Sequence, residues 1–249
     1  TVTFHPDPEI FNTQKLKPKR LFTMVRSKAY LFSGVEIRWK SAVDDGETPV
    51  EATFHFPGGL ADYLTESLGK TTTYADAPFA GKVSFQEKFG EPGSVEWAIN
   101  WTPSRDGFVQ SYCNTVPTPE GGTHVAGFWA AILKGIRAYG ELVGNRKATS
   151  ITREDLMNGG CALVSCFIRE PAFVGQTKDR LSSEGALKLV ENSVRDHFDN
   201  WLANDTKSAG AILDYLVLRA EERLRRKQEK ETARKTATKK LRLPGKLVD

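Results

Sequence analysis

Hydrophobic residues recur along the chain at two different periods. Alternation at every second position predicts strands in residues 1–4, 35–39, 52–56, 79–89, 94–101 and 107–114, and an apolar run predicts another at 161–168. Helical spacing of apolar residues predicts helices over residues 21–32, 60–68, 128–139, 183–202 and 209–235. Strands and helices of this kind in one chain indicate an α+β fold.

Glycine, proline and capping residues mark where several of these elements begin and end. Gly69 follows the short helix at the position where a left-handed cap costs least, and Thr152 with Asp155 forms a helix start signal. Pro244 and Gly245 end regular structure. We expect one compact α+β domain, residues 34–206, between a strand and helix remnant (1–33) and a long helix with its linker (207–249).

Composition narrows the class of protein. The 249 residues are 39% hydrophobic and 27% charged, which is typical of globular proteins, and no apolar run is long enough for a membrane helix. The chain begins without an initiator Met or a signal peptide, so we expect a piece of a longer protein. Three cysteines without metal-ligand spacing argue against a zinc site and a disulfide scaffold, and they favour a reducing, intracellular compartment.

Positive charge is concentrated near the C-terminus. Residues 219–246 contain twelve Lys and Arg against four Asp and Glu, whereas the whole chain has a net charge of only +4. A basic segment on a mildly acidic body is typical of proteins that face a polyanion. A solvated, charged helix explains the segment equally well, because Glu222 and Arg226, and Glu231 and Lys235, have the favourable i,i+4 spacing.

Two polar segments are candidate sites. Gln176, Thr177 and Lys178 follow Gly175, and an amide with an ammonium group can hold a phosphate without acid–base chemistry. A lone Gly-x-x-Lys is more often an ordinary surface loop. The segment 120–124 (Glu-Gly-Gly-Thr-His) could cradle a phosphate at a helix start with Thr123 as cap, but we favour a structural turn that needs glycine conformations.

The remaining residue types do not complete an active site. The four histidines are far apart in sequence and indicate surface or packing roles, while Cys161 and Cys166 lie in an apolar strand. Trp97, Trp101, Phe54 and Phe56 have strand spacing without interleaved basic residues, so we expect them in the core. No nucleophile elbow or pair of catalytic carboxylates is visible.

Five segments, taken in order, resemble one family, the B subunits of bacterial type IIA topoisomerases, which are DNA gyrase B and topoisomerase IV B. They are residues 4–7 with Ile10 and Phe11, 34–37, 120–124, 175–178 and 243–247, and they span essentially the whole chain. Residues 179–183 (Asp-Arg-Leu-Ser-Ser) look like the topoisomerase IV branch, and gyrase B is the alternative.

The resemblance implies that this is the transducer region, between an N-terminal GHKL ATPase domain and a Toprim domain. Residues 1–33 would then be the last strand of the ATPase domain and its connecting helix, and the basic helix would lead toward the Toprim domain. The transducer of this family is similar to the second domain of ribosomal protein S5, with a mixed sheet and a left-handed βαβ crossover. That handedness departs from the usual rule for parallel strands.

The resemblance also implies roles for particular residues. Gln176 and Lys178, with Thr177 in the same loop, would contact the γ-phosphate of ATP bound in the neighbouring domain and relay nucleotide state to the DNA gate. Gly121, Gly122, Thr123 and His124 would form a structural turn near that loop. The basic helix supplies candidate DNA-facing residues, which are Arg223, Arg225, Arg226, Lys227, Arg234 and Lys235.

Cofactors and partners follow from the same resemblance. The full-length protein would use ATP and Mg²⁺, bind double-stranded DNA, assemble with the A subunit of topoisomerase IV as a heterotetramer of two A and two B subunits, and self-dimerise with ATP. It would be cytoplasmic and associated with the bacterial nucleoid, and this piece alone would be inactive. Two alternatives from other classes are a stand-alone nucleic-acid-binding module and a small-molecule enzyme, for which the sequence shows no complete site.

Overall fold

The computed structural model describes residues 1–11, 16–85, 93–104 and 106–240, and for residues 235–240 it describes only the backbone. The chain forms two compact units, Thr1–Gly69 and Lys70–Asp249. The predicted boundaries after residues 33 and 206 concern the domains of a longer protein and stay a prediction. The predicted ends at residues 86–89 and 243–247 lie outside the described residues.

The first unit contains two helices and a strand pair. Helix α1 (Pro18–Leu31) begins with Pro at its first position, where a missing N–H costs nothing. Strands β1 (Glu36–Lys40) and β2 (Glu51–His55) pair antiparallel, with Ile37 opposite Phe54. Helix α2 (Leu60–Leu68) ends at Gly69, the predicted cap residue, which has a positive φ of 54° but a ψ of −120° that lies outside the left-handed helical region. The predicted helices and strand pair of this segment are confirmed.

The predicted strand at residues 1–4 is wrong. Residues 1–7 have no regular secondary structure, and no described strand pairs with them. Alternation of apolar and polar residues gives a strand one apolar and one polar face. A strand also needs a neighbouring strand that hydrogen-bonds to its backbone N–H and C=O groups.

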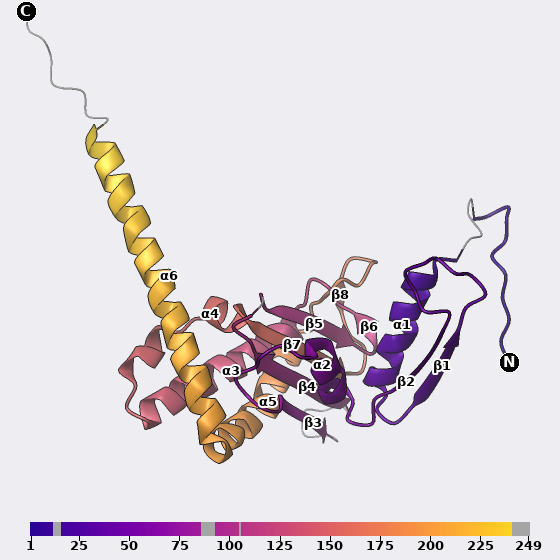
Figure 1. The fold of residues 1–249 in the computed structure, drawn as a ribbon, viewed down its shortest axis with the longest axis horizontal. Helices are drawn as coiled ribbons and strands as arrows, with labels where there is room; N and C mark the ends of the chain where they lie inside the picture. Colours follow the sequence, from indigo (N-terminus) through magenta and orange to yellow (C-terminus); the bar gives the residue numbers. More distant parts are fainter. Residues whose placement is uncertain (12–15, 86–92, 105, 241–249) are drawn as a thin grey trace, which may run out of the picture. The chain divides into compact units, whose positions relative to one another are not determined.

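The second unit is built on a five-stranded mixed sheet with the order β3-β4-β7-β5-β6 (Figure 1). The strands are β3 (Phe79–Phe85), β4 (Gly93–Trp101), β5 (Phe108–Cys113), β6 (Val116–Pro117) and β7 (Gly160–Phe167). Central strand β7 runs antiparallel to β4 and parallel to β5. Because α3 lies between β5 and β7 in sequence, these elements form the βαβ unit of the predicted mixed fold.

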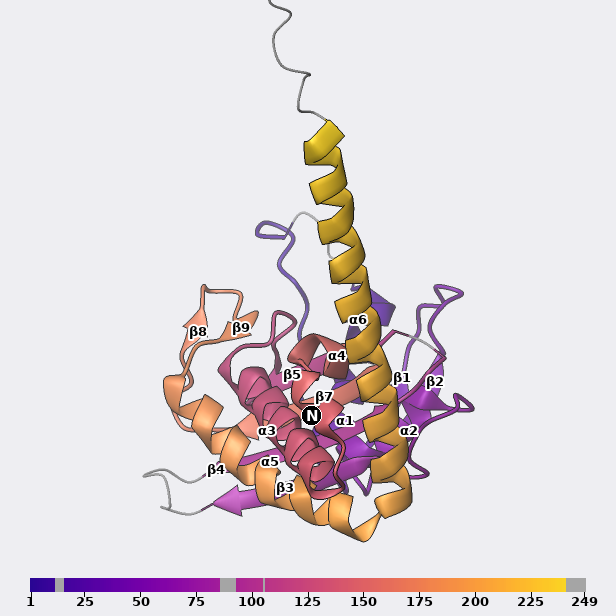
Figure 2. The same ribbon diagram turned by 90° about the vertical axis from the view of Figure 1, so that its left-hand side faces the viewer.

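Helices α3 (Thr123–Leu142) and α5 (Glu184–Asn204) pack against each other over one face of the sheet (Figure 2). That face presents Val95, Trp97, Ile99 and Trp101 from alternate positions of β4, all with no exposed surface. The predicted core positions of Trp97, Trp101, Phe54 and Phe56 are confirmed, and so is the burial of Cys161 and Cys166. Each large aromatic side chain buried in this way contributes about 2 kcal/mol or more.

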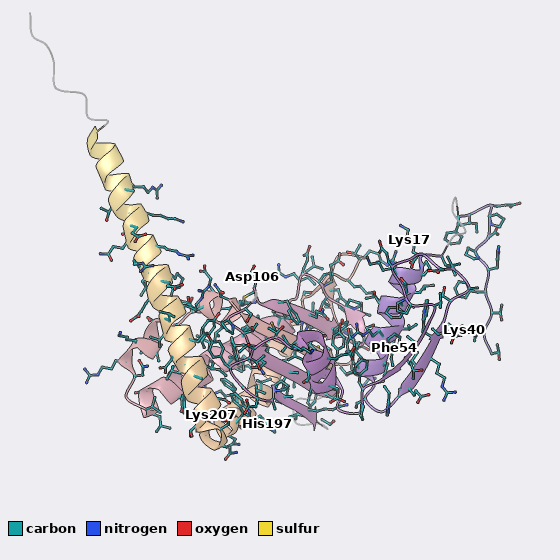
Figure 3. The ribbon with its side chains drawn as sticks, viewed as in Figure 1. Lys17, Lys40, Phe54, Asp106, His197 and Lys207 are labelled. Carbon is teal, nitrogen blue, oxygen red and sulfur yellow. The ribbon has the colours of Figure 1, made fainter. Side chains whose placement is uncertain are left out.

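A short α4 (Arg153–Met157) and the 3₁₀ helix η1 (Arg146–Ser150) precede β7, and α6 (Thr206–Lys240) follows α5. The first half of α6 buries Ile212, Leu216 and Ala220 in the core. From about residue 225 to 234 its side chains are exposed, along a helix that extends beyond the packed elements of its unit (Figures 1 and 3). No described helix has the length and apolar character needed to cross a membrane.

Candidate functional site

The segment from Gly175 to Lys178 forms the tip of a small hairpin. Strands β8 (Phe173–Val174) and β9 (Arg180–Leu181) pair antiparallel, and the tip between them is exposed. Gly175 and Lys178 both have positive φ, 72° and 61°. The Lys178 ammonium lies 5.7 Å from the centre of the Phe173 ring, a cation–π distance. The tip therefore presents one amide, one hydroxyl and one ammonium group to its surroundings.

The segment Glu120–His124 forms a turn directly before α3, and the structure brings it against the hairpin. The Glu120 N–H donates to the Asp179 carbonyl (3.0 Å), and the Leu181 N–H donates to the Gly121 carbonyl (3.0 Å). Gly122, with φ of 132°, caps α3 and forms a parallel β-bridge with Leu181. Two motifs about 55 residues apart in sequence thus become one surface feature.

Thr123 does not cap the helix, which corrects the capping arrangement that we considered. It is the first residue of α3, and its buried Oγ1 has no partner among the described residues. The reason is that Gly122 occupies the N-cap position, so Thr123 lies inside the helix, one residue beyond the position from which a side chain caps it.

His124 is fully buried at the start of α3. Its Nε2 lies 3.3 Å from Thr118 Oγ1, which is 2.7 Å from Ser111 Oγ on strand β5. Burial lowers the pKa of His124 from 6.5 to about 4, so the ring is neutral at neutral pH. A neutral, buried ring cannot attract an anion, and His124 therefore contributes packing and hydrogen bonding.

The lowered pKa of His124 predicts that the folded chain becomes less stable in acid. Because the unfolded chain binds a proton near pH 6.5 and the folded chain near pH 4, stability is fully present above pH 6.5 and falls as the pH drops between these values. We expect the free energy of unfolding from this group to fall by about 2 kcal/mol between pH 7 and 5. Urea unfolding of the chain at both values, compared with His124→Gln, measures it; an equal loss in the variant would contradict the assignment.

Potential metal ligands and the remaining titratable side chains bear on which chemistry the described residues can perform. They contain no group of three or more His, Cys, Asp or Glu that could hold a metal ion. The hydrogen bond with Cys113, together with burial, raises the pKa of the Cys166 thiol and keeps it protonated. Among described residues, His5, His55 and His197 are exposed and belong to separate segments of the chain. What the hairpin tip can do is bind an anion.

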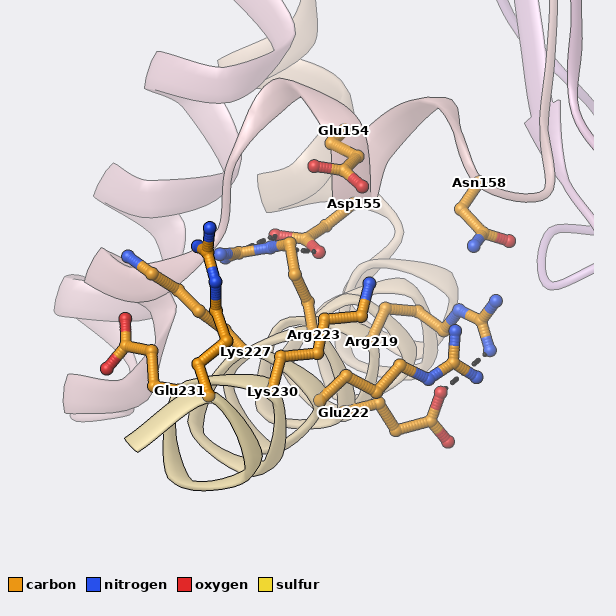
Figure 4. Close-up of a pocket in the computed structure, with 11 residues that line it drawn as sticks. Glu154, Asp155, Asn158, Arg219, Glu222, Arg223, Lys227, Lys230 and Glu231 are labelled. Atoms are coloured by element: carbon orange, nitrogen blue, oxygen red, sulfur yellow. Dashed lines mark hydrogen bonds and ion pairs between the residues drawn. The ribbon is translucent and has the colours of Figure 1, made fainter. Parts of the chain in front are cut away.

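The basic helix carries the second candidate site. One face of α6 and the neighbouring α4 line a pocket of about 470 Å³ (Figure 4). Residues that recur every three or four positions contribute from α6: Arg219, Glu222, Arg223, Arg226, Lys227, Lys230, Glu231 and Arg234. Within the described part of the chain, Arg226, Lys227 and Lys230 have no ion-pair partner. These three cations, which we call the α6 cation stripe, are available to an anion.

Arg223 has a structural position. Its guanidinium donates to both oxygens of Asp155, at 2.9 Å each, and to the Ser150 carbonyl (2.9 Å). Asp155 is 3% exposed, and the same carboxylate accepts from the Thr152 N–H and hydroxyl, so it caps α4 and holds α6 at once. The Asp155 hydrogen bond raises the pKa of Arg223. With its donors engaged, Arg223 is not included in the stripe.

The other candidate DNA-facing residues differ in their position relative to the pocket. Arg225 is not among the residues that line the pocket, and its Nε lies 3.8 Å from Glu229 Oε1. Arg234 lines the pocket, and the side chain of Lys235 lies outside the described residues. Glu222 has Arg226 at the favourable i,i+4 spacing, but its carboxylate pairs with Arg219 one turn earlier (3.0 Å).

Comparison with known proteins identifies the family to which this chain belongs. A family model described as DNA gyrase B matches residues 59–232. The chain belongs to the DNA gyrase B family of type IIA topoisomerase B subunits. It is 53% identical over its whole length to the B subunit of DNA topoisomerase 4 from Caulobacter vibrioides and 48% identical to that from Bartonella bacilliformis. The predicted likeness to the B subunit of topoisomerase IV is confirmed.

Solved structures of gyrase B family members have the same fold. The topoisomerase IV ATP-binding domain of Francisella tularensis matches 88% of this chain with a TM-score of 0.70 and 27% identity, over 57% of its own chain. The 43K ATPase domain of Thermus thermophilus gyrase B matches 91% with a TM-score of 0.74 and 25% identity, over 59% of its own chain. The chain spans 36% of the length of each of the two curated relatives named above.

Sequence reasoning missed several residues of these two candidate sites. Asp155 was visible only as a helix cap, because its partner Arg223 is 68 residues away. Ser111 and Thr118 carry no motif, and they become neighbours only when β5 and the turn meet. Lys230 could have been found from its helical spacing with Arg223, Arg226 and Lys227.

Proposed function

We propose that this chain is the transducer of a topoisomerase IV B subunit, in which the hairpin tip senses the terminal phosphate of ATP. The observation that carries the proposal is the exposed Gln176–Lys178 tip, which presents an amide, a hydroxyl and an ammonium group, while the described residues contain no metal-binding cluster. Two solved relatives are described as ATP-binding and ATPase domains. A tip of this kind fits a phosphate supplied by another part of the full-length protein.

The physical basis of sensing is a difference in contacts between two states. The γ-phosphate carries concentrated negative charge before hydrolysis, and a charge-assisted hydrogen bond from Lys178 would exist only in that state. Loss of the bond after the phosphate leaves would release the hairpin and the elements attached to it. The amide of Gln176 and the hydroxyl of Thr177 would orient the phosphate without transferring a proton.

In the full-length protein this relay would serve ATP-dependent DNA strand passage. The family resemblance implies that ATP and Mg²⁺ would be held mainly by residues outside this chain. Assembly with two A subunits and a second B subunit, binding of double-stranded DNA, dimerisation with ATP and a cytoplasmic location are parts of the same proposal. A ribosomal protein S5-like fold with a left-handed β5–α3–β7 crossover is the architecture that we propose for the transducer. This piece alone should not hydrolyse ATP.

Lysine footprinting of the full-length protein tests the sensing proposal directly. We expect a non-hydrolysable ATP analogue to slow acylation of Lys178 at least 10-fold, whereas ADP leaves it unchanged, because only the γ-phosphate engages the ammonium group. Lys188, exposed on α5, is the matched control and should react equally in both states. Equal reactivity of Lys178 with ADP and with the analogue would refute the contact.

We also propose that the α6 cation stripe contacts the phosphate backbone of DNA. Arg226, Lys227 and Lys230 lie on one helix face, and the described structure gives them no ion-pair partner. Membership of a DNA topoisomerase family favours DNA over the other anions that such a stripe could bind. Family membership also favours a DNA-facing transducer over the stand-alone nucleic-acid-binding module.

Replacing Arg226, Lys227 and Lys230 together by Gln should weaken DNA binding by the full-length protein and lower its salt slope by about 3, since each phosphate contact releases about one counterion. Filter binding or anisotropy over a range of salt concentrations measures this slope. A control with Lys70, Lys188 and Lys207 replaced by Gln removes the same charge from other exposed positions. Equal changes in the two variants would show a general charge effect and no contact by the stripe.

A further inference from the structure

The hairpin that carries the Gln176–Lys178 tip cannot hold its own position. Its two strands share only two residue pairs, Phe173 with Leu181 and Val174 with Arg180. Isolated two-stranded hairpins are marginal in water even when they are longer. Gly175 and Lys178 also hold left-handed conformations, and the latter is costly for a residue with a side chain. The tip therefore needs a support outside the hairpin.

The turn Glu120–Gly122 supplies this support through its backbone. Two hydrogen bonds of 3.0 Å join it to the hairpin, from the Glu120 N–H to the Asp179 carbonyl and from the Leu181 N–H to the Gly121 carbonyl. Of the two partner residues, Asp179 comes directly after Lys178, and Leu181 is the third residue after it. Leu181 is 1% exposed and belongs to the hydrophobic core, so the tip is fixed within three residues of Lys178.

Gly122 allows the two segments to approach this closely. A Cβ atom at this position would lie 2.2 Å from the Leu181 carbonyl oxygen and 2.6 Å from the Leu181 nitrogen, both of which are backbone atoms. Backbone atoms cannot move aside as a flexible side chain does, so any side chain here would push β9 away. The φ of 132° adds a second requirement for glycine.

The turn itself is fixed to the central sheet. The Gly121 N–H donates to the Thr118 carbonyl and the Thr118 N–H to the Ser111 carbonyl, both at 2.8 Å. The Ser111 hydroxyl donates to the Thr118 carbonyl at 2.8 Å, and the buried His124 ring lies against Thr118. Ser111 is part of β5, whose neighbour is the central strand β7. A continuous set of hydrogen bonds thus runs from the sheet to the hairpin.

We propose that the turn 120–124 positions the Gln176–Lys178 tip and that Gly122 is a positioning residue for the nucleotide contact. The proposal rests on the sensing function given above. In this proposal Gly122 itself does not contact ATP. Its contribution is to place the Lys178 ammonium where the γ-phosphate can reach it, and movement of the hairpin would be transmitted through Gly121 and Thr118 to β5.

Gly122→Ala in the full-length protein tests this proposal with two readouts. Hydrogen exchange should accelerate at least 10-fold at the amides of Glu120 and Leu181, because a Cβ separates the segments. The kcat for ATP, measured with DNA and the A subunit, should fall about 10- to 100-fold while KM changes less than 3-fold, since misplacement of a group by about 1 Å costs this much.

Gly144→Ala is the matched control. Gly144 has a φ of 75° with nothing within 4 Å of its Cβ position, so the variant also places a side chain at a positive φ, but without a clash at the hairpin. It should leave the exchange at Glu120 and Leu181 and the ATP turnover unchanged. If Gly122→Ala leaves either the exchange or the turnover at the control level, while Lys178→Ala is impaired, the positioning role is refuted.

Wild-type protein provides a measurement that needs no variant. The amides of Glu120 and Leu181 should exchange at least 10-fold more slowly than those of Gln176 and Thr177 at the tip, and equal rates would overturn the support by the turn. Failure of the sensing function is distinguishable, because it would appear as unchanged turnover in Lys178→Ala, whereas the exchange rates report the attachment alone.

Discussion

Lys178→Ala should lower DNA-dependent ATP turnover of the full-length protein about 100-fold when it is assembled with the A subunit. The removed ammonium group is the sole cation at the hairpin tip, and loss of one preorganised donor to developing phosphate charge costs about 10²-fold or more in kcat. ATP binding should remain measurable, because most contacts with the nucleotide would come from residues outside this chain. Steady-state turnover and nucleotide titration on the same preparation separate these effects.

Two further variants sharpen the result. Lys188→Ala removes an exposed lysine of α5 and should leave turnover unchanged, which excludes a general charge effect. Gln176→Ala removes a neutral donor from the tip, and we expect a smaller loss, because hydrogen bonds between a neutral and a charged group are weaker than those between two charged groups. Wild-type turnover and strand passage in Lys178→Ala would reduce the tip to an ordinary surface loop.

Asp155→Ala should destabilise the second unit by about 4 kcal/mol. The variant leaves the partly buried Arg223 guanidinium, whose side chain is 25% exposed, without its carboxylate, and breaking such a pair typically costs about 3–5 kcal/mol. It also removes the cap that the Asp155 carboxylate forms with Thr152 at the start of α4. Urea unfolding followed by circular dichroism measures the change in the free energy of unfolding.

The adjacent Glu154 provides the matched control. Its side chain is exposed and has no ion pair among the described residues, so Glu154→Ala should change stability by less than about 0.5 kcal/mol. Combining Asp155→Ala with Arg223→Ala should cost clearly less than the two single changes together, because the double variant leaves no unpaired charge. A loss below about 1 kcal/mol in Asp155→Ala would show that α4 and α6 are held mainly by apolar packing.

Local sequence patterns predicted most of the elements. Helical spacing located α1, α2, α3, α5 and α6, and the glycine at position 69 ended α2 as expected. The period-two pattern of Trp97, Ile99 and Trp101 identified the buried face of β4. These predictions depend on contacts between residues a few positions apart, where spacing alone decides which side chains share a face.

The errors arose where a distant partner was required. Residues 1–4 have the alternation of a strand, but the described structure gives them none to pair with. Glu222 has Arg226 at a suitable spacing and pairs with Arg219, and Arg223 looked like a DNA contact although it binds Asp155. Spacing on a helix specifies which pairs are possible, and the neighbouring elements decide which pairs form.

By itself, the sequence determined the family, the α+β class and the two segments that form the candidate sensing site, because motif residues and hydrophobic periods are local properties. Only the tertiary structure showed that the Glu120–His124 turn holds the hairpin of Gln176–Lys178, through bonds to Asp179 and Leu181. It also separated the structural Arg223 from Arg226, Lys227 and Lys230, which have no ion-pair partner among the described residues. These facts depend on backbone contacts between segments far apart in the chain, which no residue type specifies on its own.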